Sequence, residues 1–182
     1  MPVKFYGFDP GLRHGVLLLV EFEEKSKTAK VDVCFSWNKK DTHLSLQSTP
    51  LEISVFTNIL IGKLTDPALA LGIEYDPQNV YMRNHSIQVV IMAFMIGYLS
   101  RGAQSRGLPI VYVKPTQLKE YFGISPKEGK EYMNRTLLDL HGWVLPEIIY
   151  KDSDHFDAFL IAYFTWRMMN EPILSSTVIS GK

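Results

Sequence analysis

Apolar runs divide the first part of the chain into three extended segments. Residues 3–9 are rich in aromatic side chains, and Pro10-Gly11 ends this run. A second apolar run covers 16–22, and 29–37 then alternates apolar and polar positions. Strict alternation is typical of a half-buried strand, and short connections favour antiparallel neighbours. The pattern therefore predicts an antiparallel meander of three strands.

Two helix starts share one local pattern, a capping hydroxyl followed by proline and then an acid. They are Thr49-Pro50-Leu51-Glu52 and Ser125-Pro126-Lys127-Glu128. Proline loses no hydrogen bond at the first helical position, and the acid can reach back to the cap. We expect helices from about 50 to 63 and from about 126 to 141.

The remaining apolar runs complete an α/β order. They predict a strand at 68–74, a long helix at 86–106, a strand at 108–113 and a last helix at 154–169. The order β-β-β-α-β-α-β-α-α predicts a mixed five-stranded sheet flanked by helices, with right-handed crossovers between its late strands. At 182 residues the chain fits one domain, which we place at 1–171, followed by a flexible tail at 172–182.

Four acids stand where these elements end or begin. Asp9 and Glu74 each end a strand, and Asp154 and Asp157 open the last helix, three residues apart on one face. Neighbouring strands lie about 4.8 Å apart, so if these two strands are parallel neighbours, both acids project at the same carboxyl edge. The first turn of the last helix need only lie over that edge to add the other two. Such an all-oxygen site suits hard divalent metals and two-metal phosphodiester hydrolysis.

Each of these acids also has a purely structural interpretation. Asp9 in Asp-Pro-Gly is a common turn residue, and Asp154 and Asp157 suit the positive end of any helix. Glu74 has a possible ion-pair partner in Arg83.

Three nearby residues are weaker candidates. His155 has a nitrogen that can bind metal, but we interpret it as a surface or phosphate-contacting residue. Asp76 and Asp152 are interpreted as loop and cap residues.

Composition narrows the class of protein. A single cysteine, Cys34, excludes an intramolecular disulfide framework and agrees with a reducing compartment. We expect no signal peptide, since Lys4 and Asp9 bracket a short apolar stretch at the start of the chain. We expect no membrane span, since the longest apolar segment, near 87–99, is short and interrupted.

Net charge is zero, yet the charges are uneven. The stretch 101–135 holds a cluster of basic side chains that is either a solvated helical surface or a local nucleic-acid-binding face. Its members are Arg101, Arg106, Lys114, Lys119, Lys127, Lys130 and Arg135.

Several of these segments together resemble one family, the RuvC-type Holliday junction resolvases. The resemblance rests on Phe-Asp-Pro-Gly-Leu-Arg-His-Gly (8–15), Ile-Glu (73–74), Arg-Asn-His-Ser (83–86), the strand and basic loop at 108–119 and 123–130, and Asp-His-Phe-Asp-Ala (154–158). These segments span most of the chain, in the family's order.

The resemblance implies an RNase H-like fold and a homodimer that nicks four-way DNA junctions symmetrically. It implies that Asp9, Glu74, Asp154 and Asp157 hold two Mg²⁺ ions per site, for which Mn²⁺ can substitute. It further implies a cytoplasmic, nucleoid-associated protein of a bacterial or phage-infected cell. DNA contacts are assigned to Lys119, Lys127, Lys130, Arg83, Lys114 and Tyr75. Which of Lys127 and Lys130 matches the family stays open, because the spacing from Lys119 is shorter here.

The chain departs from the family pattern after its second acid. Tyr75-Asp76-Pro77 intervenes, so that Tyr75 or Tyr81 would serve as the aromatic that probes the junction centre. This leaves open a relaxed nuclease that cuts flaps and other branched DNAs. It also leaves a noncatalytic DNA-binding protein of the same fold. An actin-like or sugar-kinase-like ATPase would need a second domain that the chain is too short to contain. The apolar helix at 87–99 is either a core helix or part of the dimer interface.

Overall fold

The computed structural model describes residues 2–12, 14–38, 44–75, 87–123, 125, 142–151 and 153–170. Five strands form one sheet: β1 (Val3–Asp9), β2 (Gly15–Glu23), β3 (Thr28–Trp37), β4 (Leu71–Glu74) and β5 (Ile110–Val113). The helices are α1 (Pro50–Lys63), α3 (Ile87–Gln104), α4 (Pro115–Tyr121), α6 (Ile148–Lys151) and α7 (Ser153–Asn170). Among the described helices, none is long and apolar enough to cross a membrane.

The sheet has the mixed topology that the sequence predicts. Its strand order is β3-β2-β1-β4-β5, so β1 lies at the centre. β2 pairs antiparallel with both β1 and β3, whereas β4 pairs parallel with β1 and with β5. The two parallel strands begin later than expected, at Leu71 and Ile110. Pro109 precedes β5 and contributes only its carbonyl, which accepts from the Leu71 N–H at 2.9 Å.

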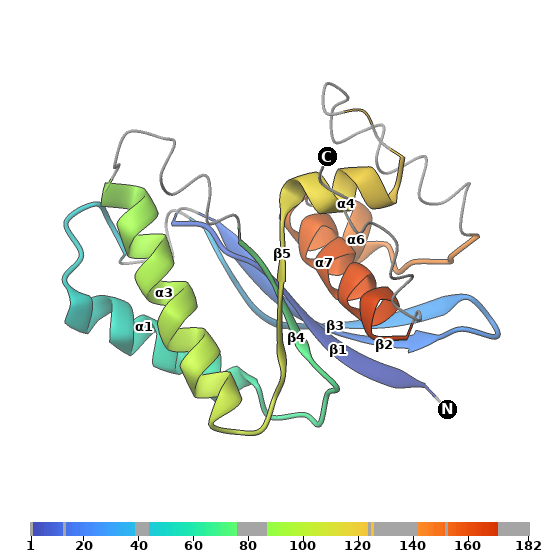
Figure 1. The fold of residues 1–182 in the computed structure, drawn as a ribbon, viewed down its shortest axis with the longest axis horizontal. Helices are drawn as coiled ribbons and strands as arrows, with labels where there is room; N and C mark the ends of the chain where they lie inside the picture. The colour runs from blue at the N-terminus through green and yellow to red at the C-terminus, as the bar shows by residue number, and fades with distance from the viewer. Residues whose placement is uncertain are drawn as a thin grey trace, which may run out of the picture.

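Helices cover both faces of the sheet (Figure 1). α1 and α3 lie on one face, and α7 lies on the other beside the shorter α4 and α6. Strand alternation divides the core accordingly, because successive side chains point to opposite faces. Tyr6 and Phe8 pack in the cluster under α1 and α3, whereas Phe5 packs in the cluster under α7.

Two glycines let α7 lie close against the centre of the sheet. Gly7 of β1 and Gly72 of β4 are direct neighbours in the parallel register. A Cβ atom at Gly7 would overlap the backbone carbonyl oxygen of Ala158 and lie 2.9 Å from the Cβ of Ala162. A Cβ at Gly72 would overlap the Thr165 hydroxyl. Atoms of α7 therefore occupy the space that side chains would need on these two strands: backbone at Gly7, and chiefly the Thr165 and Ile161 side chains at Gly72.

The cap predicted at Thr49 is present. The Glu52 N–H donates to Thr49 Oγ1 at 3.3 Å, and the Thr49 N–H donates to the Glu52 carboxylate at 2.7 Å. The Thr49 hydroxyl donates to the same carboxylate at 3.0 Å, and the hydrogen bonds from the Thr49 N–H and hydroxyl lower the pKa of Glu52.

The apolar pattern of the sequence did not predict the short helix α4. Pro115 lies just beyond β5 and opens α4, where the Lys114 N–H donates to Gln117 Oε1 at 3.0 Å. Proline is common at the first position of a helix, because no hydrogen bond within the helix is lost there. The helix expected at 126–141 and the flexible tail expected at 172–182 lie outside the described residues.

Adding one methyl group at Gly7 tests the close packing of α7. We expect Gly7→Ala to lower the free energy of unfolding by ~3 kcal/mol, because backbone atoms of α7 must move to admit the new Cβ. Gly62→Ala is the matched control, since a Cβ at Gly62 meets nothing within 4 Å. That variant should gain about 0.5–1 kcal/mol from helix propensity. Urea unfolding measures both, and equal stability of the two variants would contradict the packing described.

Candidate metal centre

Asp9 lies at the carboxyl end of the central strand and on the α7 side of the sheet. Its neighbour Phe8 is fully buried in the cluster under α1 and α3. Because strand side chains alternate, Asp9 shares the opposite face with Gly7, which contacts α7. The Asp9 side chain is half-buried.

The first turns of α7 bring two further carboxylates to the same place. Asp154 and Asp157 are three residues apart, so they share a face of the helix. The next residue, Ala158, is the one whose carbonyl lies against Gly7. The Ser153 hydroxyl donates to the Asp154 carboxylate at 3.2 Å, which helps to orient that side chain.

Asp9, Asp154 and Asp157 form one carboxylate group. One oxygen from each lies within 4.8 Å of the others, and all three side chains are half-buried. Like charges this close repel one another unless a cation or protons compensate them. Carboxylate oxygens are the ligands that Mg²⁺ and Mn²⁺ prefer, and partial exposure leaves room for water and substrate. The donor set therefore fits a hard divalent cation.

Glu74 lies beside this group but is not a member of it. Phe8 pairs with Ile73 in the parallel register, so Asp9 and Glu74 are the next residues along two neighbouring strands. Gly72 contacts α7, and alternation therefore places Glu74 on the α7 side as well. The structure thus brings together three of the four predicted acids and places the fourth at the same edge.

The other candidate residues lie around this edge or outside the described part of the chain. Lys114 directly follows β5, whose last residue pairs with Glu74. Lys119 is half-buried on α4. His155 is half-buried on α7, and its Nδ1 is buried. The candidates outside the described residues are Arg83, Tyr81, Lys127, Lys130, Asp76 and Asp152.

Tyr75 directly follows Glu74 and packs against a second tyrosine. Its ring lies 5.6 Å from that of Tyr112 on β5, tilted by 56°. The Tyr112 hydroxyl donates to Ser100 Oγ on α3 at 2.9 Å, and 48% of Tyr112 is exposed. The pair lies on the α3 side of the sheet, opposite the carboxylates.

Sequence reasoning missed the residues that make the group possible. Gly7 and Gly72 each precede an acid by two positions, in Gly-Phe-Asp (7–9) and Gly-Ile-Glu (72–74). The repeated tripeptide was a visible signal. It places a residue without a side chain and an acid on the same face of each strand.

Divalent cations should stabilise the protein through this group. At 100 times Kd, Mg²⁺ or Mn²⁺ should raise Tm by roughly 5–10 °C, because the ion binds only the folded state. Asp157→Asn should raise Tm without metal, since it relieves repulsion, and should remove most of the metal-induced rise. Asp32→Asn, an exposed acid on β3, is the control and should respond to metal like the wild type. A wild-type Tm that neither ion changes would contradict the site.

Comparisons with known proteins agree with the geometry at the level of the fold. No protein-family model and no curated protein sequence matches the chain. A solved structure of Thermus thermophilus RuvC matches with a TM-score of 0.64 at 20% identity, covering 92% of this chain and 97% of that one. The T. thermophilus RuvC complex with a Holliday junction substrate gives 0.59 at 20% identity, covering 91% and 96%. The yeast mitochondrial Holliday junction resolvase Ydc2 gives 0.62 at 17% identity, covering 88% and 76%. The chain therefore has the RNase H-like fold of the RuvC-type resolvases.

Proposed function

We propose that the protein is a metal-dependent, structure-selective DNA endonuclease that nicks four-way junctions symmetrically as a homodimer. The observation that carries this proposal is the half-buried group of Asp9, Asp154 and Asp157. It lies at the carboxyl edge of the sheet in a fold shared with RuvC and with a yeast junction resolvase. One of the matching structures is that of RuvC bound to a Holliday junction substrate.

Each acid has a distinct position relative to the proposed ions. Asp154 and Asp157 with Asp9 would hold one ion, and Asp9 with Glu74 at the same strand level would hold a second. Bound Mg²⁺ or Mn²⁺ would activate a water and stabilise the leaving oxygen of a phosphodiester. The protein's own contribution is to hold the carboxylates close together before the ions arrive.

DNA contacts are proposed for basic and aromatic residues around the carboxyl edge. Lys114 is the N-cap residue at the start of α4, and Lys119 lies further along that helix. The helix follows β5, the strand that pairs with β4. Lysines at such positions bind the phosphate backbone and make affinity depend on salt. Tyr75 is proposed as a base-contacting aromatic beside Glu74. Lys127, Lys130 and Arg83, with His155 as an auxiliary phosphate contact, complete the proposed set.

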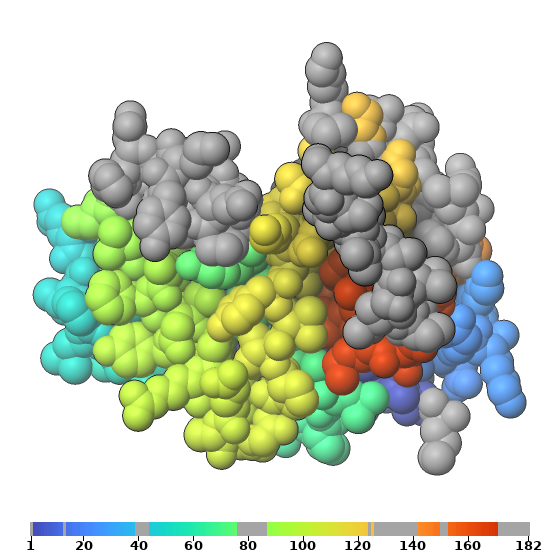
Figure 2. Space-filling view, in the orientation of Figure 1, coloured from blue at the N-terminus to red at the C-terminus, as the bar shows by residue number. Residues whose placement is uncertain are grey.

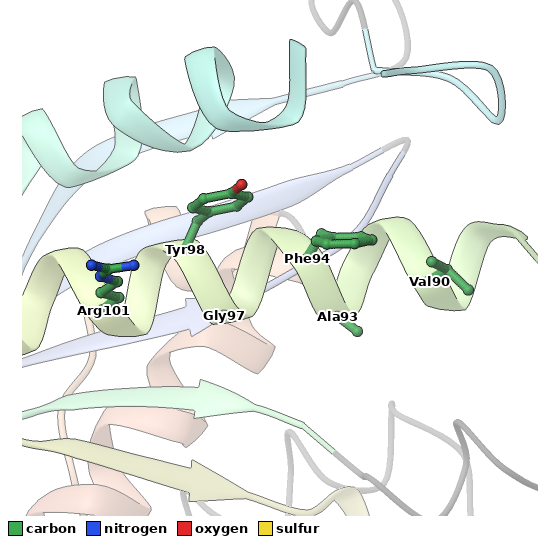
Figure 3. Close-up of a pocket in the computed structure, with 6 residues that line it drawn as sticks. All are labelled: Val90, Ala93, Phe94, Gly97, Tyr98 and Arg101. Carbon is green, nitrogen blue, oxygen red and sulfur yellow. The ribbon is translucent and has the colours of Figure 1, made fainter. Parts of the chain in front are cut away.

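A second copy of the chain is proposed to cover α3. This helix is apolar on its solvent side as well as its buried side, which is typical of a helix with two packing partners. An open groove of about 470 Å³ runs along it, lined by Val90, Ala93, Phe94, Gly97, Tyr98 and Arg101 (Figure 3). In the space-filling view α3 forms a broad band of this face of the molecule (Figure 2).

Gly97 supports a close approach by another helix. A glycine inside a helix costs about 1 kcal/mol relative to alanine. A Cβ at Gly97 would meet nothing within 4 Å, so contacts within the described part of the chain do not require glycine there. A partner helix that passes close to the backbone would require it. Two-fold symmetry would then place two active sites about one axis, as symmetric nicking demands.

Two alternatives keep the same fold. A relaxed nuclease that prefers flaps or other branched DNAs would use the same acids. A noncatalytic DNA-binding protein would gain nothing from carboxylates that repel phosphates, so the acidic group argues against it. Either nuclease would act on DNA in the cytoplasm of a bacterial or phage-infected cell.

Cleavage of synthetic branched DNA tests the proposed activity. With Mg²⁺ the protein should nick a four-way junction at symmetric positions and leave linear duplex intact. Asp9→Asn should lower the rate at least 10²-fold, since it removes a charge from the group that holds the metal. Asp32→Asn changes the same charge on the outer part of β3 and should cleave normally.

Three outcomes of this assay would revise the proposal. No cleavage of any branched substrate would refute the nuclease activity. Equal cleavage by Asp9→Asn would refute the assigned site. A preference for flaps over junctions would favour the relaxed nuclease.

A charge placed on α3 tests the homodimer. Phe94→Arg should give a monomer in analytical ultracentrifugation, because an unpaired charge at an apolar interface is costly to bury. Phe94 is 47% exposed in one chain, so the variant should keep its fold. Met169→Arg on α7 is the matched control, with the same 47% exposure, and should remain a dimer. A monomeric wild type, or a dimeric Phe94→Arg variant, would contradict the proposed interface.

A further inference from the structure

The indole of Trp37 is hydrogen-bonded to the turn that follows Asp9. Trp37 ends β3 and is only 4% exposed. Its Nε1–H donates to the carbonyl oxygen of Gly11 at 3.2 Å. Gly11 lies two residues after Asp9, in the turn that joins β1 to β2. A buried indole N–H needs an acceptor, and here the acceptor belongs to the turn that directly follows Asp9.

The indole ring also contacts the chain on both sides of Asp9. It lies 6.0 Å from the ring of Phe8, the residue before Asp9. On the other side it covers Gly15, where a Cβ would overlap ring atoms of Trp37. Gly15 and Trp37 are opposite each other in the β2–β3 register. The ring therefore holds the start and the end of the turn, and its N–H holds the middle.

Further aromatic rings fix the orientation of the indole. Phe56 of α1 packs edge-on at 5.1 Å, and Phe35 lies at 5.9 Å. Trp37 is thus supported by the helix layer on the face of the sheet opposite α7. This support matters because a hydrogen bond can position the turn only if its donor is itself fixed.

We infer that Trp37 is a positioning residue for the metal centre, and that its indole N–H sets the turn after Asp9 so that Asp9 meets Asp154 and Asp157. The inference rests on the proposed function. A phenylalanine would fill much of the same space without holding the Gly11 carbonyl. A role in packing alone would therefore tolerate Trp37→Phe, whereas a positioning role would not.

Manganese binding by the DNA-free protein tests the inference. Free Mn²⁺ measured by electron paramagnetic resonance gives the affinity without any cleavage. We expect Trp37→Phe to bind Mn²⁺ about fivefold more weakly, the factor expected for loss of one neutral hydrogen bond. In cleavage assays its kcat should fall at low Mn²⁺ and recover at saturating Mn²⁺, with KM for the junction unchanged.

Trp166→Phe is the matched control. Trp166 is 3% exposed and stacks on Phe22 at 4.8 Å in the aromatic cluster under α7, away from the turn. It should lose comparable packing and keep the wild-type Mn²⁺ affinity. Wild-type affinity in Trp37→Phe, or equal weakening in both variants, would overturn the positioning role alone. A wild type that binds no Mn²⁺ would overturn the metal centre as well.

Discussion

The close approach of α7 to the centre of the sheet is the constraint on which the site depends. Gly7 and Gly72 lie side by side on β1 and β4, and atoms of α7 fill the space above them. Ala158 of α7 touches Gly7, and Asp157 and Asp154 precede it by one and four residues. A bulkier residue at either glycine would lift the helix and separate its carboxylates from Asp9. Packing therefore holds together charges that repel one another, and the stability of the helix–sheet contact offsets that repulsion.

Much of this arrangement was predictable because its signals are local. Apolar runs ended by proline or glycine predicted the strands, and the last residues of two of these strands are the acids Asp9 and Glu74. The convergence of Asp9 with Asp154 and Asp157 was predicted on the condition that the last helix sets its first turn over the carboxyl edge of the sheet, and the three carboxylates do lie together. The mixed sheet was predictable from the lengths of the connections. Short connections join antiparallel strands, whereas parallel strands need a long crossover.

What escaped prediction depends on contacts between distant residues. One exception is local: α4, which Pro115 opens, is only 7 residues long and too short for an apolar period to mark it. Glu74 lies at the same level of the sheet as Asp9, but its side chain is outside the group of three carboxylates. Strand register alone could not show this difference. Trp37 is separated from Gly11 by 26 positions, and nothing in the local pattern of β3 marks its N–H as a contact to the turn. Local propensity cannot report such pairings, because they exist only once the sheet has formed.

The repeated Gly-x-acid tripeptide has a consequence for how this protein can diverge. In both strands the glycine and the acid stand two positions apart and share a face. Deleting or inserting one residue between them would turn the acid to the other face of the sheet while the glycine still met the helix. Substitutions can accumulate around these tripeptides, but insertions and deletions within them cannot. Distant descendants of this chain should therefore keep an ungapped Gly-x-acid spacing even after overall sequence similarity has faded.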